Sequence, residues 1–270
     1  EGTTMTTSPR PTALITGASG GIGLELARLC AKGNHDVVLV ARNRDKLEEI
    51  SKYLSGMYQV RVEVLPADLR EPGAPASIME EIGRRGLAVD VLVNNAGFGE
   101  WGLFGRGDPQ RQLDMIQVNI TALTQLTRLA LPGMVSRRRG RILNLASTAA
   151  FAPGPLMAVY YASKAYVLSF SEAIGNELRG TGITVTALCP GPTRTGFADA
   201  AGMRETNLFN SPAVMDAAPV ALAGYRGMMR GRAVVIPGIA NQLLVLSIRL
   251  GPRWLVRRIS RWLQERRREQ

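Results

Sequence analysis

Tyr160 and Lys164, four residues apart, are the pair in this 270-residue chain best suited to acid–base chemistry. Neither proline nor glycine occurs between Tyr160 and Phe170, and the pattern there predicts a helix. Residues i and i+4 share one helix face, so the phenol and the ammonium group should project into the same space. An ordinary tyrosine has a pKa of about 10. We expect the lysine charge to lower that pKa towards the range of a general acid or base. By itself the pair also fits an ordinary helix, so the rest of the chain must decide.

A glycine-rich turn near the N-terminus predicts a phosphate-binding loop. The residues Ala13–Ile15 form a short apolar strand, and Gly17, Gly21 and Gly23 follow before a stretch of helical periodicity. In a strand–turn–helix unit, backbone N–H groups and a helix N-terminus can receive a pyrophosphate. The spacing differs from the usual G-x-G-x-x-G fingerprint. The alternative interpretation is a tight loop without a ligand.

The end of the next predicted strand bears on the choice between two dinucleotides. NAD sites usually place a carboxylate here for the ribose 2′-hydroxyl. Here the strand Asp36–Ala41 is followed by Arg42, Asn43 and Arg44. A guanidinium group can bind a 2′-phosphate through two hydrogen bonds, whereas an aspartate would repel it. The sequence therefore favours NADP(H), with a solvated basic loop as the alternative.

The elements that carry these residues alternate along the chain. Further strands are predicted to end at Asp68–Leu69, Asn94–Gly97, Ser147 and Pro190–Gly191. Helices are predicted between them, over Asp45–Leu54, Ala74–Arg85, Asp108–Met134 and Tyr160–Arg179. Alternating strands and helices predict an α/β fold: a single-domain, Rossmann-type, doubly wound parallel sheet with helices on both faces. Ligands of such sheets lie beyond the carboxyl ends of the strands, and every polar signature above lies at such an end.

Taken together, these motifs resemble the short-chain dehydrogenase/reductase family. In order they are TGASGGIG (16–23), NNAG (94–97), Asn119, Ser147, YYASK (160–164) and PGPTRT (190–195). The resemblance covers roughly Pro11 to Phe197, and Arg42 makes it closest to the NADP-preferring group.

The resemblance implies a division of labour among four residues. Tyr160 would protonate a carbonyl oxygen during reduction, or act as base in the reverse direction. Ser147 would hydrogen-bond the same oxygen. Lys164 would hold the nicotinamide ribose and depress the pKa of Tyr160, and Asn119 would hold a water in a proton relay to Lys164. Tyr161, one helical step of about 100° further on, should point elsewhere, towards the substrate.

The same matches imply the cofactor contacts. Asn95 and Thr16 are expected to be structural instead. The expected cofactor-binding set is Gly17, Ser19, Gly20, Gly21, Ile22, Gly23, Arg42, Asp68, Leu69, Asn94, Ala96, Gly97, Tyr160, Lys164, Pro190, Gly191, Thr193 and Thr195.

Composition is consistent with one well-cored domain. Apolar residues make up 46% of the chain, and no linker divides it. We expect a disordered N-terminal lead-in over residues 1–9, a catalytic domain over 10–250 and a basic amphipathic extension over 251–270. Cys30 and Cys189 give no disulfide framework, which favours a cytoplasmic location. With His35 as the single histidine, no metal site is expected.

The net charge of +11 is concentrated in the C-terminal segment. From Arg226 onwards there are eleven arginines and two glutamates. In this segment Trp254, Leu255, Ile259, Trp262 and Leu263 recur at helical spacing, with Arg253, Arg257 and Arg261 opposite them. One interpretation is reversible docking on an anionic membrane surface. The other is packing of the tryptophan face on the protein or on a sister subunit. No nucleic-acid-reading motif accompanies the arginines, so nucleic acid is not an expected partner.

The substrate is expected to be a ketone or aldehyde with a hydrophobic body, or the matching secondary alcohol. The region 195–218 would form a lid, whose Phe197, Met203, Leu208 and Phe209 are apolar. Opposite it we expect Phe98, Trp101, Ala149, Phe151 and Met157. Arg194 and Arg204 leave a charged substrate open. The resemblance further implies a homodimer or homotetramer. A second interpretation of the chain is a non-catalytic NADP-binding regulator, although such a protein has no need of the acid–base residues.

Overall fold

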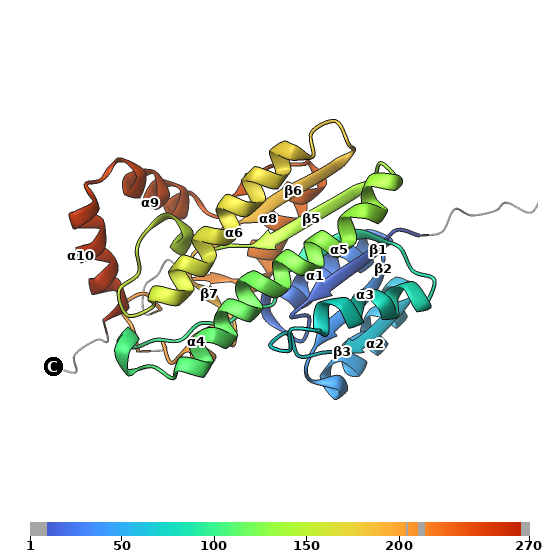
Figure 1. Cartoon of the computed structure of the whole chain (residues 1–270), viewed down its shortest axis with the longest axis horizontal. Helices are drawn as coiled ribbons and strands as arrows, with labels where there is room; N and C mark the ends of the chain where they lie inside the picture. The colour runs from blue at the N-terminus through green and yellow to red at the C-terminus, as the bar shows by residue number, and fades with distance from the viewer. Residues whose placement is uncertain (1–9, 204, 210–213, 266–270) are drawn as a thin grey trace, which may run out of the picture.

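The computed structural model describes residues 10–203, 205–209 and 214–265, so the expected lead-in over residues 1–9 lies outside it. Its centre is a parallel sheet with the strand order β3-β2-β1-β4-β5-β6-β9 (Figure 1). The strands are β1 (Thr12–Thr16), β2 (Asp36–Ala41), β3 (Val62–Pro66), β4 (Val89–Asn94), β5 (Gly140–Leu145), β6 (Ile183–Leu188) and β9 (Val234–Val235). The predicted doubly wound parallel sheet is confirmed. The seventh strand, β9, was not predicted.

Helices cover both faces of this sheet. One face carries α1 (Gly21–Lys32), α2 (Arg44–Tyr58) and α8 (Ala217–Met229), which pack on residues such as Ile15 and Leu39. The other face carries α3 (Ala74–Arg84), α5 (Leu123–Ser136) and α6 (Ala158–Glu177). The inner strands β1, β2, β4, β5 and β6 are mostly buried and rich in β-branched and aliphatic residues, as a sheet covered on both faces requires.

Local sequence signals explain where several helices begin. The side chain of Asn43 caps α2 by accepting a hydrogen bond of 2.9 Å from the Lys46 amide. Asp108 caps α4 (Pro109–Ile116) in the same way, and Pro109 stands at the first helical position. Helix α1 is different, because Gly20 precedes it and no side chain caps its first turn. Its first N–H groups are therefore left for another acceptor.

The long helix predicted over Asp108–Met134 is interrupted. A π-helical segment, η2 (Gln117–Ala122), separates α4 from α5, and Asn119 lies within it. π-Helical turns occur mainly as single bulges at functional positions. Sequence periodicity did not reveal this widening, because the segments before and after it keep an ordinary helical pattern.

The chain beyond β6 builds a cover over the carboxyl edge of the sheet. Short strands β7 (Thr193–Arg194) and β8 (Met215–Asp216) pair with each other, and α7 (Phe197–Ala201) lies between them in the chain. Helices α9 (Ile239–Leu250) and α10 (Arg253–Gln264) then stand at one side of the molecule (Figure 1). The backbone of Leu208 donates a hydrogen bond of 3.0 Å to Leu263, so α10 is joined to the expected lid.

Candidate active site and dinucleotide groove

One large cavity runs along the carboxyl ends of the strands. Its volume is about 1330 Å³, larger than the roughly 300–1,000 Å³ of a pocket for one small molecule. It extends from the glycine-rich turn before α1 to the inner face of α10. The cavity therefore has room for a dinucleotide together with a second molecule.

The glycine-rich turn forms one end of this cavity. Gly17 and Gly21 have φ angles of +65° and +55°, a conformation that favours glycine. Gly23 is required for another reason: a Cβ atom there would lie 2.3 Å from the Gly17 carbonyl oxygen. The turn holds this shape next to the uncapped N-terminus of α1, which fits a pyrophosphate.

Arg42 stands at the position that would meet a 2′-phosphate. It is exposed and lines the cavity. Its neighbours are otherwise engaged: Asn43 caps α2, and Arg44 forms an ion pair of 3.6 Å with Glu48. Among the described residues no ion pair involves Arg42, so its guanidinium group remains available to an anion.

Asp68 and Leu69 also line the cavity, as expected. Asp68 forms an ion pair with Arg70, and this hydrogen-bonded partner holds the pKa of the Asp68 carboxyl below its usual range. The carboxylate is therefore ionised at neutral pH and can accept hydrogen bonds at this edge of the groove.

The two asparagines of NNAG have different roles. The side chain of Asn94 is buried and donates hydrogen bonds to Thr127 and Asn144 at 3.0 and 2.9 Å. Its side chain therefore does not face the cavity, and the expected ribose contact of Asn94 stays a prediction. Asn95 lines the cavity and donates to the carbonyl of Thr16 at 2.9 Å, so the expected structural role of that pair is found. Ala96 and Gly97 line the cavity.

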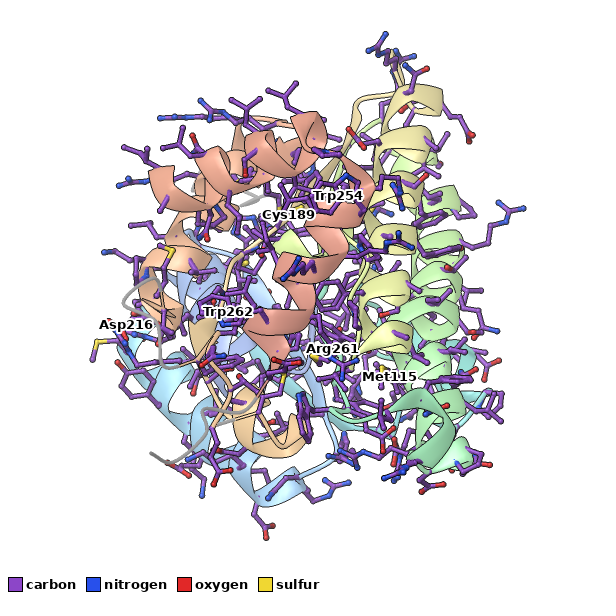
Figure 2. The ribbon with its side chains drawn as sticks, turned by 90° about the vertical axis from the view of Figure 1, so that its left-hand side faces the viewer. Met115, Cys189, Asp216, Trp254, Arg261 and Trp262 are labelled. Atoms are coloured by element: carbon purple, nitrogen blue, oxygen red, sulfur yellow. The ribbon has the colours of Figure 1, made fainter. Side chains whose placement is uncertain are left out.

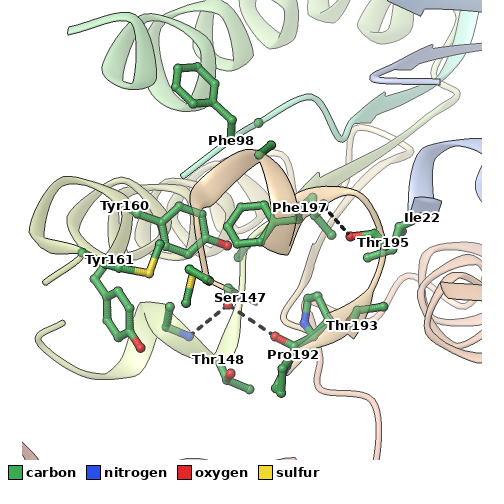
Figure 3. A pocket seen from close by; sticks show the side chains of 18 of the residues that line it. Ile22, Phe98, Ser147, Thr148, Tyr160, Tyr161, Pro192, Thr193, Thr195 and Phe197 are labelled. Carbon is green, nitrogen blue, oxygen red and sulfur yellow. Dashed lines mark hydrogen bonds between the residues drawn. The ribbon is translucent and has the colours of Figure 1, made fainter. Parts of the chain in front are cut away.

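Tyr160 and Ser147 meet in the middle of the cavity. Ser147 follows β5, and its Oγ accepts a hydrogen bond of 3.1 Å from the Ala149 amide. The ring of Tyr160 lies between those of Tyr161 and Phe197, with ring centres 6.2 and 5.1 Å away (Figure 3). The Tyr160 hydroxyl thus stands where the glycine-lined half of the cavity meets its apolar half.

The environment of Tyr160 corrects one expectation. Burial raises the pKa of the Tyr160 hydroxyl, and a hydrogen bond with the Ser147 side chain only partly opposes this effect. Lys164 is not among the groups that lower this pKa. Burial lowers the pKa of Lys164 itself to about 8, because the residue is only 4% exposed. The phenol is therefore held in its protonated form.

Lys164 and Asn119 pack behind the cavity wall. The Lys164 ammonium group donates a hydrogen bond of 2.7 Å to the carbonyl of Leu145. The amide group of Asn119 bonds both the N–H and the carbonyl of Phe98, at 3.1 and 3.0 Å, and donates to Ser163 at 3.0 Å. Both side chains adjoin Gly97, where a Cβ atom would lie 3.0 Å from Asn119 and 3.4 Å from Lys164. Asn119 thus fixes the loop that follows β4.

The segment after β6 closes the groove from the other side. Pro190, Gly191, Thr193 and Thr195 all line the cavity. Thr195 lies against the glycine-rich turn, because a Cβ atom on Gly21 would come within 2.9 Å of its methyl group. Three residues of the expected cofactor-binding set do not line the cavity: Gly23, Asn94 and Lys164.

The other half of the cavity is apolar. Its lining includes Phe98, Ala149, Met157, Phe197, Met203, Leu208 and Phe209, as expected. Two expected wall residues are used elsewhere. Trp101 donates a hydrogen bond of 2.7 Å to the Gln264 carbonyl, and Phe151 packs under the guanidinium group of Arg249 at 5.3 Å. Arg204 lies outside the described residues.

Helix α10 supplies a wall that sequence reasoning missed. Its Val256, Ser260 and Gln264 are buried, and all three line the cavity. Gln264 donates a hydrogen bond of 2.6 Å to the Tyr161 hydroxyl, and its own Oε1 has no partner among the described residues. The spacing of these three residues was a signal, but serine and glutamine do not suggest a buried face.

No cluster of three histidine, cysteine or acidic side chains that could hold a metal ion occurs among the described residues. The polar groups present instead fit a dinucleotide: an uncapped helix N-terminus for phosphates, a guanidinium group at the second strand, and a hydroxyl pair where a nicotinamide and a carbonyl would meet.

Comparison with known proteins agrees with this arrangement. The chain is 37% identical over 185 residues to a very-long-chain 3-oxoacyl-CoA reductase of Anas platyrhynchos, covering 66% of this chain but only 58% of that protein. It is 40% identical over 197 residues to a putative ketoacyl reductase of the monensin polyketide synthase of Streptomyces virginiae, covering 72% and 75% of the two chains.

A solved short-chain dehydrogenase of Sphingobium yanoikuyae, in complex with NADPH, superposes with a TM-score of 0.80. It is 36% identical, over 88% of this chain and 92% of its own. Residues 11–206 match the family model described as short chain dehydrogenase. The chain therefore belongs to the short-chain dehydrogenase/reductase family of oxidoreductases.

Proposed function

We propose that the protein is an NADPH-dependent reductase of ketones or aldehydes with a hydrophobic body. The observation that carries this proposal is the position of the Tyr160 hydroxyl, between a groove suited to a dinucleotide and an apolar chamber lined by Met157, Phe197 and Phe209. When bound, the reduced nicotinamide supplies the hydride.

Residues of the chain would then protonate and hydrogen-bond the carbonyl oxygen of the substrate. Tyr160 lines the cavity as the proposed proton donor. Burial raises the pKa of its hydroxyl, so the phenol is protonated at neutral pH, as an ordinary tyrosine also is. Ser147 lies beside it and is suited to hydrogen-bond the same oxygen. Lys164 places a cation beside this ring, with its Nζ 5.7 Å from the Tyr160 ring centre, although it is not among the groups that lower the Tyr160 pKa.

Recognition of NADPH rather than NADH is assigned to Arg42. It is exposed at the groove, and its two polar neighbours are engaged elsewhere. The Sphingobium yanoikuyae relative, whose structure contains NADPH, supports this assignment.

An acyl ketone suits the apolar chamber best. Both relatives named above are ketoacyl-type reductases by name. In this chain the chamber continues from Phe197 past Met203 to the aliphatic side chains of α9 and α10, so an extended hydrocarbon body would be covered along its length.

We also propose a homodimer formed through the face of α4, α5 and α6; in Figure 1, α4 continues into α5 along one line and α6 runs beside them. The large apolar residues exposed on these helices are Leu113, Ile116, Leu129, Val135 and Tyr166. Such a patch on one face is typical of an interface. We place the protein in a reducing compartment such as the cytoplasm, consistent with two buried free cysteines, Cys30 and Cys189.

The test is NADPH oxidation with a panel of hydrophobic ketones, comparing the wild type with Tyr160→Phe. We expect at least about a 100-fold loss in kcat/KM for the variant, the usual contribution of a general acid. Tyr161→Phe is the matched control for kcat, because it removes the adjacent hydroxyl from the same helix and leaves the proposed proton donor in place. An NADP-binding regulator would bind NADPH and turn over none of the ketones, and equal rates for the wild type and Tyr160→Phe would contradict the role of this hydroxyl.

A further inference from the structure

Helix α9 exposes a row of large aliphatic side chains. Ile239, Leu243, Leu246 and Leu250 follow one another at intervals of four, three and four residues, so they share one helix face. Each is between 53% and 80% exposed. Neighbouring residues of the same helix, Asn241 and Val245, are buried and hold it on the body of the protein.

Helix α10 continues this surface with aromatic and cationic residues. Its outermost row is Trp254, Arg258 and Trp262, at successive steps of four residues. Both tryptophans are 59% exposed. Figure 2 looks onto α10, with Trp254 near its first turn and Trp262 near its last. The opposite face of α10 is the buried one, so the tryptophan face does not pack on the described body of the same chain.

Positive charge accompanies these tryptophans. Arg253, Arg257 and Arg258 are exposed, and the described residues offer none of them an ion pair. Arg261 pairs with Glu265 at 3.2 Å, and α10 itself contains no acidic residue. A surface of exposed aliphatic, tryptophan and arginine side chains matches an anionic bilayer, in which tryptophan lies at the headgroup level and arginine meets lipid phosphate.

We propose that the exposed face of α9 and α10 docks on the surface of an anionic membrane. No described helix is both long and apolar enough to cross a bilayer, so the contact would be peripheral. A second copy of the chain is a poorer occupant. A two-fold contact through this face would bring Arg253, Arg257 and Arg258 close to the same three residues of the second copy, and these like charges would repel each other.

This docking has a consequence for the substrate, which rests on the proposed function. Leu255 and Ile259 are exposed on α10 and also line the cavity. Leu244 of α9 does the same. An apolar path thus leads from the docking face to the chamber beside Tyr160, and a long-chain carbonyl compound dissolved in the bilayer could enter without crossing water.

The first experiment measures binding and needs no activity. The full chain is sedimented with vesicles of phosphatidylcholine alone and of equal parts phosphatidylcholine and phosphatidylglycerol. We expect sedimentation with the anionic vesicles that weakens as salt rises. The triple variant Arg253→Gln, Arg257→Gln, Arg258→Gln should partition about 100-fold more weakly, since each basic residue near an anionic surface contributes to binding.

The matched control removes the same charge from the far end of the sheet. Arg179, Arg226 and Arg230 are exposed near the C-terminal ends of α6 and α8, and their replacement by glutamine should leave vesicle binding unchanged. Trp254→Ala with Trp262→Ala should weaken binding without changing its salt dependence. A wild type that stays in solution with anionic vesicles overturns the proposal, and so does a triple α10 variant that binds as the wild type does.

A second experiment separates this proposal from the proposed function. The triple α10 variant should reduce a short, water-soluble ketone at the wild-type rate, because none of its changed residues lines the cavity. It should be slower only on a long-chain ketone supplied in anionic vesicles. Vesicle binding without any ketone reduction would refute the enzyme assignment and leave the docking intact. Ketone reduction without vesicle binding would refute the docking and leave the enzyme assignment intact.

Discussion

The Nζ atom of Lys164 lies 5.7 Å from the centre of the Tyr160 ring, while its hydrogen bond goes to the carbonyl of Leu145 at 2.7 Å. The cation is thus fixed beside the phenol by the end of β5. Both groups are buried, and burial moves their pKa values in opposite directions: that of Tyr160 rises and that of Lys164 falls to about 8. In the proposed reduction, the neutral phenol is the form that donates the proton.

The burial of Lys164 predicts a pH-dependent cost in stability. Below pH 8 the lysine is charged in both folded and unfolded chains, and the folded chain bears the full cost of burying the charge. Between about 8 and the ordinary value of 10.5, the folded chain releases its proton first, so the contribution of Lys164 to stability improves as pH rises. Lys164→Met lacks this group and should be the more stable form at pH 7.

Urea unfolding at pH 7 and pH 9.5 measures this effect. As the pH rises above about 8, the free energy of unfolding of the wild type should increase relative to that of Lys164→Met, by up to about 1.4 kcal/mol per pH unit. Tyr160 is common to both proteins and drops out of the difference. Lys52→Met changes an exposed lysine and should show no such trend. A constant difference between wild type and Lys164→Met would contradict the buried charge.

The role of Arg42 is tested by reversing its charge. Arg42→Asp should raise the KM for NADPH about 10- to 100-fold, because it removes a charge-assisted hydrogen bond and adds a carboxylate beside the 2′-phosphate. NADH, which lacks that phosphate, should be used as well as before or better. Arg44→Asp is the control, since Arg44 already pairs with Glu48. If the two variants respond alike, another group recognises the 2′ position.

The hydrogen bond between Tyr161 and Gln264 joins the catalytic helix to α10 at 2.6 Å. Because Gln264 Oε1 is buried without a described partner, this corner of the cavity can accept a polar group of a substrate. Gln264→Leu should raise KM about three- to tenfold for ketones carrying a distal hydroxyl or amide, and lower it for purely aliphatic ones. Tyr161→Phe should act in the same direction, and the double variant should add little. Additive effects would mean that the two residues act separately.

Much of the site was predictable because parallel strands end at one edge of a sheet. That rule brought together Gly17, Arg42, Asp68, Ser147 and Pro190 from five separate segments. The rule does not tell which side chain, that of Asn94 or that of Asn95, faces the cavity. Successive residues of a strand point to opposite faces, and only the partners Thr127 and Asn144 show which side chain is taken by the interior.

Other features depended on packing that no local pattern expresses. Strand β9 has only two residues, too few for a periodic signal. Helix α10 was predicted, but its buried side was not. A hydrophobic pattern favours the tryptophans, whereas the chain buries Ser260 and Gln264, which can face a cavity and satisfy polar groups there. The net pKa of Tyr160 likewise depends on how deeply the ring is buried, which the spacing of Tyr160 and Lys164 does not reveal.

The glycine-rich turn separates a requirement of folding from a requirement of binding. A Cβ atom on Gly23 would lie 2.3 Å from the Gly17 carbonyl oxygen, so Gly23→Ala should lower the free energy of unfolding by about 1–3 kcal/mol.

A Cβ atom on Gly20 would meet nothing within 4 Å, and its extended backbone suits any residue. Gly20→Ala should therefore keep wild-type stability. It would nevertheless place a methyl group beside the N-terminus of α1, where the phosphates are expected, and so should weaken NADPH binding. Urea unfolding together with NADPH fluorescence titration distinguishes the two effects. Gly20→Ala binding NADPH as tightly as the wild type would mean that the pyrophosphate lies elsewhere in the cavity.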